Sequence, residues 1–236
     1  MSRITDKFTV LKSNGKTAFV PFIMGGDPDL KETLSILKEL PKAGADIIEI
    51  GIPFSDPMAD GPTIQLAGLR ALKHNISIKD IFKIIKTFRT ENNDTPIILM
   101  GYYNPIYQYG LSDFCREAFE NGVDGMIIVD LPPEEEDEFI PYTQEYGLSL
   151  IKLITPTTDE ARLQKTLKNA SGFLYYVAVA GITGDKSAAY GDVGAAISQI
   201  KKHTDLPVAV GFGIKTQDDV KNMSQHADAV VVGSAL

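Results

Sequence analysis

Eight short apolar runs separated by helical segments constrain the fold of this 236-residue chain more than any other feature. Most of the runs are nearly continuous in apolar residues, which is typical of strands buried on both faces. Between them, in segments such as 29–44, 76–88 and 112–122, apolar residues recur at the spacing of an amphipathic helix, and several segments open on Asp or Ser, which are good N-caps. The expected strands are 18–24, 46–52, 96–102, 125–130, 148–154, 173–179, 207–213 and 228–234.

This alternation predicts an α/β fold, a single TIM (β/α)8 barrel domain over residues 1–236. A weak internal repeat supports it: in 43–51, 121–130 and 225–234, a helix end and small residues precede an Asp and then a β-rich run. An open doubly wound sheet is the alternative, but no GxGxxG follows the first expected strand. Residues 4–12 predict an extra N-terminal helix that closes the bottom of the barrel. We expect the eighth helix to be absent from the given chain.

Composition excludes several classes of function. The net charge of −8 and the absence of a basic stripe argue against nucleic acid. No apolar run approaches the length of a membrane span, and the N-terminus lacks the apolar core of a secretory signal. One cysteine, Cys115, and three scattered histidines argue against a disulfide framework and a zinc site. The sequence therefore predicts a protein of a reducing compartment with no metal and no membrane partner.

Two carboxylates mark the C-terminal end of the second expected strand, where barrel enzymes place their active sites. Glu49 follows the apolar pair Ile47 and Ile48. Apolar surroundings raise the pKa of a carboxyl group and suit it to general acid–base chemistry. A solvated or salt-bridged rim residue is the alternative. Asp60 follows eleven positions later in Asp-Gly-Pro, and this local sequence by itself favours a turn former. The same explanation applies to Asp56, which precedes Pro57. Pro53, Pro57 and Pro62 predict a stiff loop between these acids.

Glycine-rich segments at the later strand ends suggest where a phosphate would bind. Residues 177–194 predict a long lid, and short Gly motifs follow the seventh and eighth strands, where many barrels bind phosphate through main-chain N–H groups. Because the chain is acidic, we expect such a phosphate cradle to be local and neutral. The candidates are Gly184, Gly213, Gly233 and Ser234. Aromatic and apolar residues near the strand ends are either barrel core or a flat slot for an aromatic ring; they are Phe22, Met100, Tyr102, Tyr175 and Phe212.

These segments resemble the tryptophan synthase α subunit family. The resemblance rests on PFIMGGDP, EIGIPFSDPMADGPTIQ, GYYNPI, DLPPEE, AGITG and GFGI, which occur in the family's order and spacing from Phe19 to Ser234. It implies a TIM barrel lyase that cleaves indole-3-glycerol phosphate to indole and glyceraldehyde 3-phosphate. It also implies a partner, the tryptophan synthase β subunit, in an α2β2 heterotetramer. Pyridoxal phosphate is then expected only on that β subunit, with no cofactor on this chain, and the compartment is the bacterial cytoplasm or a plastid stroma.

The resemblance also implies roles for individual residues. Glu49 and Asp60 fall on the family's catalytic acids. Thr183 falls on the lid residue that meets the Asp56/Asp60 loop. The indole pocket is implied for Phe22, Met100, Tyr102 and Tyr175, and the phosphate site for Gly184, Gly213, Gly233 and Ser234. A partner and lid-contact loop is implied for Pro53, Asp56, Pro57, Met58 and Pro132. Ala178 and Val179 depart from residues common in the family, which leaves lid closure open.

Two other functions remain open from the sequence. Lys152 lies within an apolar strand, and a desolvated lysine is the nucleophile of Schiff-base aldolases. An outward-facing lysine beneath a helix explains the same position. The chain is alternatively an α-like activator of the β subunit with little or no catalysis of its own, although the intact Glu49 and Asp60 pair argues against that.

Overall fold

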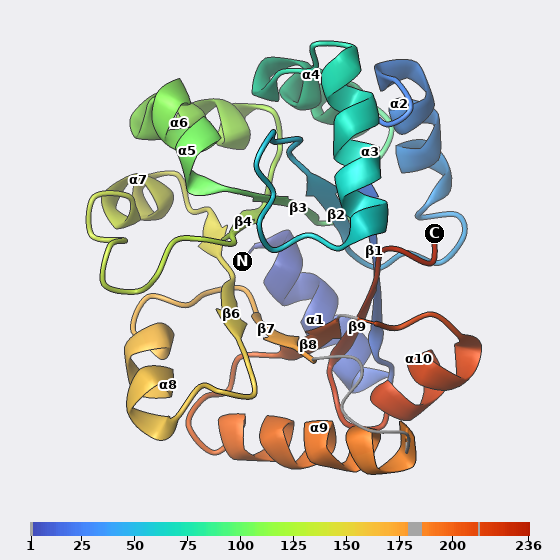
Figure 1. Cartoon of the computed structure of the whole chain (residues 1–236), viewed down its shortest axis with the longest axis vertical. Helices are drawn as coiled ribbons and strands as arrows, with labels where there is room; N and C mark the ends of the chain where they lie inside the picture. Colours follow the sequence, from blue (N-terminus) through green and yellow to red (C-terminus); the bar gives the residue numbers. More distant parts are fainter. Residues whose placement is uncertain (1, 179–185, 212) are drawn as a thin grey trace.

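The computed structural model describes residues 2–178, 186–211 and 213–236, and these form a closed barrel of parallel strands with helices around it (Figure 1). The strands in the described part of the chain follow the order β5-β4-β3-β2-β1-β9-β8-β7-β6, and every pairing is parallel. Their bounds are β1 Ala18–Met24, β2 Ile48–Gly51, β3 Ile97–Gly101, β4 Gly125–Ile128, β5 Ser149–Leu150, β6 Lys152–Ile154, β7 Leu174–Val177, β8 Val208–Gly211 and β9 Ala229–Val232.

The last two strands in this order, β5 and β6, are one crossing of the barrel interrupted at Ile151. β5 pairs with β4 and β6 pairs with β7, so the same crossing closes the sheet on itself. The N–H of Ile151 donates to the carbonyl of Met126 at 2.9 Å, which continues the ladder across the interruption. The predicted (β/α)8 barrel is therefore confirmed. All eight expected strands are present, most of them shorter than expected by one to three residues at their ends.

The helices lie outside the sheet, except α1 (Figure 1). They are α1 Arg3–Ser13, α2 Leu30–Glu39, α3 Pro62–Lys73, α4 Ile78–Arg89, α5 Tyr103–Tyr109, α6 Leu111–Glu120, α7 Ile140–Glu145, α8 Glu160–Leu167, α9 Lys186–Ile200 and α10 Gln217–Met223. Asp29 caps α2, and Ser77 forms a capping box with Asp80 on α4, as the sequence predicts. α6 begins two residues earlier than expected, with Gly110 rather than Ser112 at its N-cap. No helix follows β9 in the described residues.

Helix α1 closes the bottom of the barrel, which confirms the prediction for residues 4–12. Its apolar side chains Ile4, Phe8 and Leu11 are buried in one cluster with Ile98 of β3 and with Phe173, which directly precedes β7. The ring centroids of Phe8 and Phe173 lie 5.7 Å apart. Burying a large apolar side chain stabilises a fold by about 1.5–3 kcal/mol, so this helix contributes strongly to the floor beneath the barrel.

The aspartates of the internal repeat share one structural role. Asp46, Asp124 and Asp228 each precede a strand, and each carboxylate accepts the N–H of a residue on the neighbouring strand. The donors are Phe19 at 3.0 Å, Ile97 at 2.8 Å and Val208 at 2.8 Å. These contacts satisfy main-chain groups where the ladder begins, at the end of the barrel opposite the strands' carboxyl ends. The aspartate of each repeat thus aligns its strand with the neighbouring strand.

Two sequence expectations about loops are corrected. Pro62 belongs to the first turn of α3, where a missing N–H costs nothing, so the stiff loop ends before it. The glycine-rich stretch expected to be a long lid includes residues 179–185, which lie outside the described residues; its part from Lys186 onward belongs to α9, so Gly191 and Gly194 are helical. A Cβ on Gly194 would lie 2.7 Å from the ring of His226, which explains a glycine inside this helix. Among the described residues, no helix is long and apolar enough to cross a membrane.

Candidate active site

A cavity of about 320 Å³ opens at the carboxyl ends of the strands, inside the barrel. Its floor consists of side chains that alternate with the outward-facing residues of each strand, because successive strand residues point to opposite faces. Phe22, Glu49 and Met100 come from β1, β2 and β3. Tyr175 and Val177 come from β7 on the other side of the cavity. The cavity therefore lies where the sequence predicts the site of a barrel enzyme.

Glu49 lies at the centre of β2, and its side chain is almost completely buried. It is 1% exposed, and its Oε1 has no hydrogen-bond partner among the described residues. Its register neighbours on either side are Phe22 and Ile98, so apolar walls flank the carboxyl group. Burial, reinforced by the charge of Asp60, raises the pKa of Glu49 to about 8. The carboxyl group is therefore protonated at neutral pH and faces a cavity, which suits a general acid.

Asp60 lies in the loop between β2 and α3, with its side chain at the edge of the same cavity. Tyr102 Oη donates to Asp60 Oδ1 at 3.1 Å, and the N–H of Ala59 donates to Tyr102 Oη at 3.0 Å. Partial burial raises the pKa of Asp60, whereas the bond from Tyr102 lowers it. The structure thus gives the two acids different environments: Glu49 has no donor among the described residues, and Asp60 has one.

The structure brings together part of the set of residues predicted for an apolar slot. Phe22, Met100 and Tyr175 line the cavity, whereas Tyr102 does not; it lies beneath the loop of Asp60 and holds it by a hydrogen bond. Tyr175 is fitted tightly, since a Cβ on Gly211 would lie 2.1 Å from its hydroxyl oxygen. The sequence did not single out seven further apolar lining residues, which are Ala59, Ile64, Ile214, Val129, Leu153, Val177 and Val231. The last four belong to or directly follow strands, where the period-two alternation offered a signal.

The phosphate candidates are partly placed by the structure. Gly213, Gly233 and Ser234 all line the cavity, on the side of β8 and β9. Gly213 has φ +77°, a conformation that favours glycine. Thr183, Gly184 and Phe212, like Val179, lie outside the described residues. Ala178 is buried at the end of β7. The sequence overlooked Lys215, which also lines the cavity and brings a positive charge to a cradle that was expected to be neutral.

The loop predicted to contact a partner varies in exposure. Pro53 is buried, Pro57 and Pro132 are half-buried, and Asp56 is exposed. Met58 is 80% exposed, an unusual position for a large apolar side chain, and lies two residues before Asp60 in the chain. Main-chain bonds from Met58 to Asp56 at 2.9 Å and from Asp60 to Pro57 at 3.1 Å make the loop compact.

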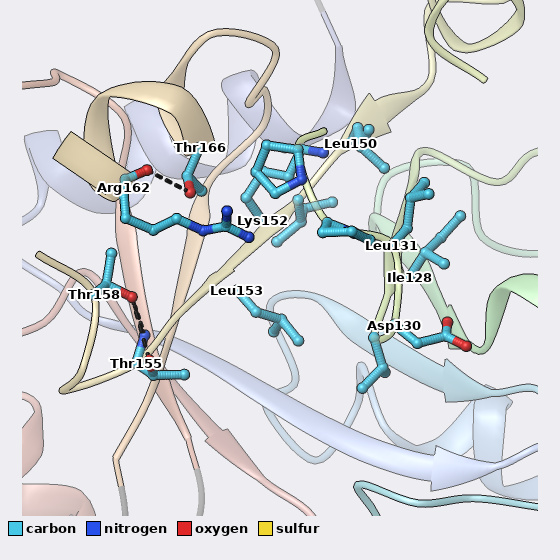
Figure 2. Close-up of a pocket in the computed structure, with 14 residues that line it drawn as sticks. Ile128, Asp130, Leu131, Leu150, Lys152, Leu153, Thr155, Thr158, Arg162 and Thr166 are labelled. Carbon is cyan, nitrogen blue, oxygen red and sulfur yellow. Dashed lines mark hydrogen bonds between the residues drawn. The ribbon is translucent and has the colours of Figure 1, made fainter. Parts of the chain in front are cut away.

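Lys152 lies outside the central cavity. Its strand neighbours Ile151 and Leu153 pack in the barrel interior, so Lys152 points outward. There its ammonium group forms an ion pair with buried Glu136, whose other oxygen accepts a bond from Asn169 at 2.7 Å. Burial lowers the pKa of Lys152 to about 8. Figure 2 shows Lys152 and Arg162 in a separate cavity of about 350 Å³, between β6 and α8.

Among the described residues, no group of three or more His, Cys, Asp or Glu side chains could hold a metal ion. What the central cavity can do is proton transfer: it combines a protonated buried carboxyl group, a hydrogen-bonded carboxylate, an apolar slot and glycine loops beside one lysine.

Comparison with known proteins identifies the relatives of this chain. A family model described as tryptophan synthase alpha chain matches residues 8–236. The solved tryptophan synthase subunit alpha from Legionella pneumophila str. Paris is 44% identical, with a TM-score of 0.93, over 100% of this chain and 87% of that one. The subunit alpha from Campylobacter jejuni is 36% identical, with a TM-score of 0.86, over 93% and 87%. Tryptophan synthase from M. tuberculosis, in an open form with BRD0059 bound, is 30% identical, with a TM-score of 0.91, over 100% and 90%.

Proposed function

Because the chain belongs to the tryptophan synthase alpha-chain family, we propose that it is a carbon–carbon lyase that cleaves indole-3-glycerol phosphate to indole and glyceraldehyde 3-phosphate. The observation that carries this proposal is the pair of unlike acids in one apolar cavity. Glu49 is buried and protonated at neutral pH, and Asp60 accepts a hydrogen bond from Tyr102. A retro-aldol cleavage of an indole needs one acid in each of these states.

Glu49 acts first as the general acid. Its carboxyl group gives a proton to C3 of the indole ring, which turns the ring into an electron sink. The resulting carboxylate then removes the proton from the hydroxyl group on the adjacent carbon of the side chain. The carbon–carbon bond breaks, its electron pair returns to the indole ring, and the hydroxyl carbon becomes the aldehyde. Glu49 regains its proton at the end, so the cycle needs no cofactor.

Asp60 stabilises the positive charge that develops at the ring N–H when C3 is protonated. This requires a carboxylate fixed in place before the reaction. Tyr102 provides the fixing, since its hydroxyl group donates to Asp60 and accepts from the main chain of the same loop. The aromatic and apolar side chains of the cavity then hold the ring between the two acids.

The partner in this proposal is the tryptophan synthase β subunit, which would receive indole within an α2β2 assembly and carry the pyridoxal phosphate. Support comes from the compact loop with Pro53, Asp56, Pro57 and Met58 beside the cavity, and from Pro132 after β4. An exposed methionine next to a catalytic loop suits a surface that is covered in a complex. The proposed compartment is the cytoplasm, or a plastid stroma.

The proposal is tested by incubating the full chain with indole-3-glycerol phosphate and measuring indole, with and without a tryptophan synthase β subunit. Indole release by the chain alone, increased by the β subunit, is the expected result. A chain that releases no indole in either condition but still stimulates the β subunit with serine and indole would be an activator and not a lyase. The Asp60→Asn variant is expected to lose most of the activity while remaining folded.

A further inference from the structure

Lys215 carries a positive charge at the proposed phosphate end of the cavity. The described lining contains only three ionisable charged residues, namely Glu49, Asp60 and Lys215. Lys215 follows Gly213 in the loop between β8 and α10, and Gly233 and Ser234 follow the neighbouring strand β9. Lys215 is exposed and lies on the glycine side of the cavity, in a different segment from the strand of Glu49 and the loop of Asp60.

The backbone of this loop is anchored by residues that do not line the cavity. The N–H groups of Lys215 and Thr216 both donate to Asp219 Oδ2, at 3.0 and 2.9 Å. Tyr190 Oη, from α9, donates to the other oxygen of Asp219 at 2.5 Å. Asp219 is 5% exposed, and these donors, led by Tyr190, hold its pKa well below its ordinary value. A charged, buried carboxylate thus fixes the position from which the Lys215 side chain extends.

The positive charge of Lys215 bears on how strongly the cavity binds an anionic ligand. The chain carries a net charge of −8 and the cavity holds the acid Asp60 beside the neutral Glu49, so the field of the chain opposes the approach of a dianion. Main-chain N–H groups supply hydrogen bonds but no full charge. A lysine at the rim supplies a mobile point charge that suits phosphate. We propose that Lys215 is a substrate-binding residue that recognises the phosphate monoester group of the ligand, which rests on the proposed function of the cavity.

The test measures binding of glycerol 3-phosphate to the full chain by calorimetry, in the wild type and in variants of two lysines. Lys215→Met is expected to weaken binding about tenfold, the size of one charge-assisted contact. Lys215→Arg keeps the charge and is expected to bind within about threefold of the wild type. Lys221→Met is the matched control, because it removes the same charge from an exposed position on α10 outside the cavity.

Salt provides the second readout. Raising the salt concentration is expected to weaken binding to the wild type more than to the Lys215→Met variant, since screening acts on the charge that the variant lacks. Equal losses of affinity in the Lys215→Met and Lys221→Met variants would overturn the proposal. They would show that Lys215 acts only through the long-range electrostatic field of the chain. Unchanged binding in Lys215→Met, or an equal loss in Lys215→Arg, would overturn it as well.

This experiment separates the role of Lys215 from the lyase reaction. Glycerol 3-phosphate contains no indole and is not cleaved, so its binding does not depend on Glu49 chemistry. Charge-dependent binding in a chain that releases no indole would retain the phosphate site and reject the lyase. Indole release with binding insensitive to Lys215 would retain the lyase and reject the lysine's role.

Discussion

Replacing Glu49 by glutamine should change how the stability of this protein depends on pH. Burial raises the pKa of Glu49 to about 8 in the folded chain, from an ordinary value of 4.5. Between these two values the folded protein holds a proton that the unfolded chain releases. The stabilisation is fully present below pH 4.5 and is lost as the pH rises to about 8. The glutamine variant has no such proton.

The magnitude follows from the same two pKa values. The complete difference corresponds to roughly 5 kcal/mol in the free energy of unfolding, and roughly 3–4 kcal/mol of it falls between about pH 5 and pH 8. This is a large fraction of the stability of an ordinary domain, about 5–15 kcal/mol. We therefore expect the wild type to lose stability over this interval relative to Glu49→Gln, until the variant is the more stable protein at alkaline pH.

Urea unfolding at a series of pH values measures this difference directly. Glu135→Gln serves as the control, because Glu135 is an exposed glutamate and the substitution has the same chemistry. The control should follow the wild type at every pH. If the wild type and Glu49→Gln lose stability in parallel from pH 5 to pH 8, Glu49 is not a protonated buried group and the reasoning about the general acid fails.

Three further predictions test the surroundings of the site and the fold. Tyr102→Phe removes a hydrogen-bond donor to Asp60, so the pKa of Asp60 should rise. Indole release should fall about tenfold, and the acidic limb of the pH–rate profile should move to higher pH. Asp124→Ala should cost roughly 3–5 kcal/mol in urea unfolding, because it leaves the buried Arg89 guanidinium without its carboxylate; Asp46→Ala, which removes only a strand contact, should cost about 1–2 kcal/mol. Gly211→Ala places a Cβ against the Tyr175 hydroxyl and should lower kcat/KM at least about tenfold, whereas Gly191→Ala, in open space on α9, should leave it unchanged.

The fold was predictable because the hydrophobic pattern has few solutions. Continuous apolar runs require burial on both faces, and alternation with amphipathic segments supplies helices to cover them. The ends of the elements were less predictable. Pro62 appeared to be a loop residue, yet proline is also well suited to the first turn of a helix, and only the three-dimensional context decides between these uses.

The candidate site was predictable where it depended on strand geometry. Glu49 was predictable because an acidic residue inside an apolar strand must face either the cavity or the helices. The sequence shows both its position in the strand and the apolar residues beside it. The bond between Tyr102 and Asp60 joins residues 42 positions apart through a loop, and no local pattern encodes it. Lys152 was ambiguous in isolation, although its neighbours Ile151 and Leu153 indicate the face to which it points.

Lys215 was overlooked for a different reason. The glycines around it favour phosphate binding by main-chain N–H groups. The acidic composition of the chain likewise favours a phosphate site without a charged side chain. Whether a lysine after a strand lines a cavity or extends into solvent depends on the anchoring of its loop, here by Asp219 and Tyr190 from two helices. That arrangement becomes visible only when α9 and α10 are placed side by side.

The most direct test of the central claim is indole release from indole-3-glycerol phosphate at pH 7 by the wild type and by Glu49→Gln, both checked for folding by circular dichroism. A residue that acts first as the general acid and then as the base accelerates the reaction by more than about a hundredfold. The variant should therefore be nearly inactive. Glu49→Asp should retain a small activity, because it keeps the acid but moves it away from the ring. Cleavage by Glu49→Gln at the rate of the wild type would contradict the account.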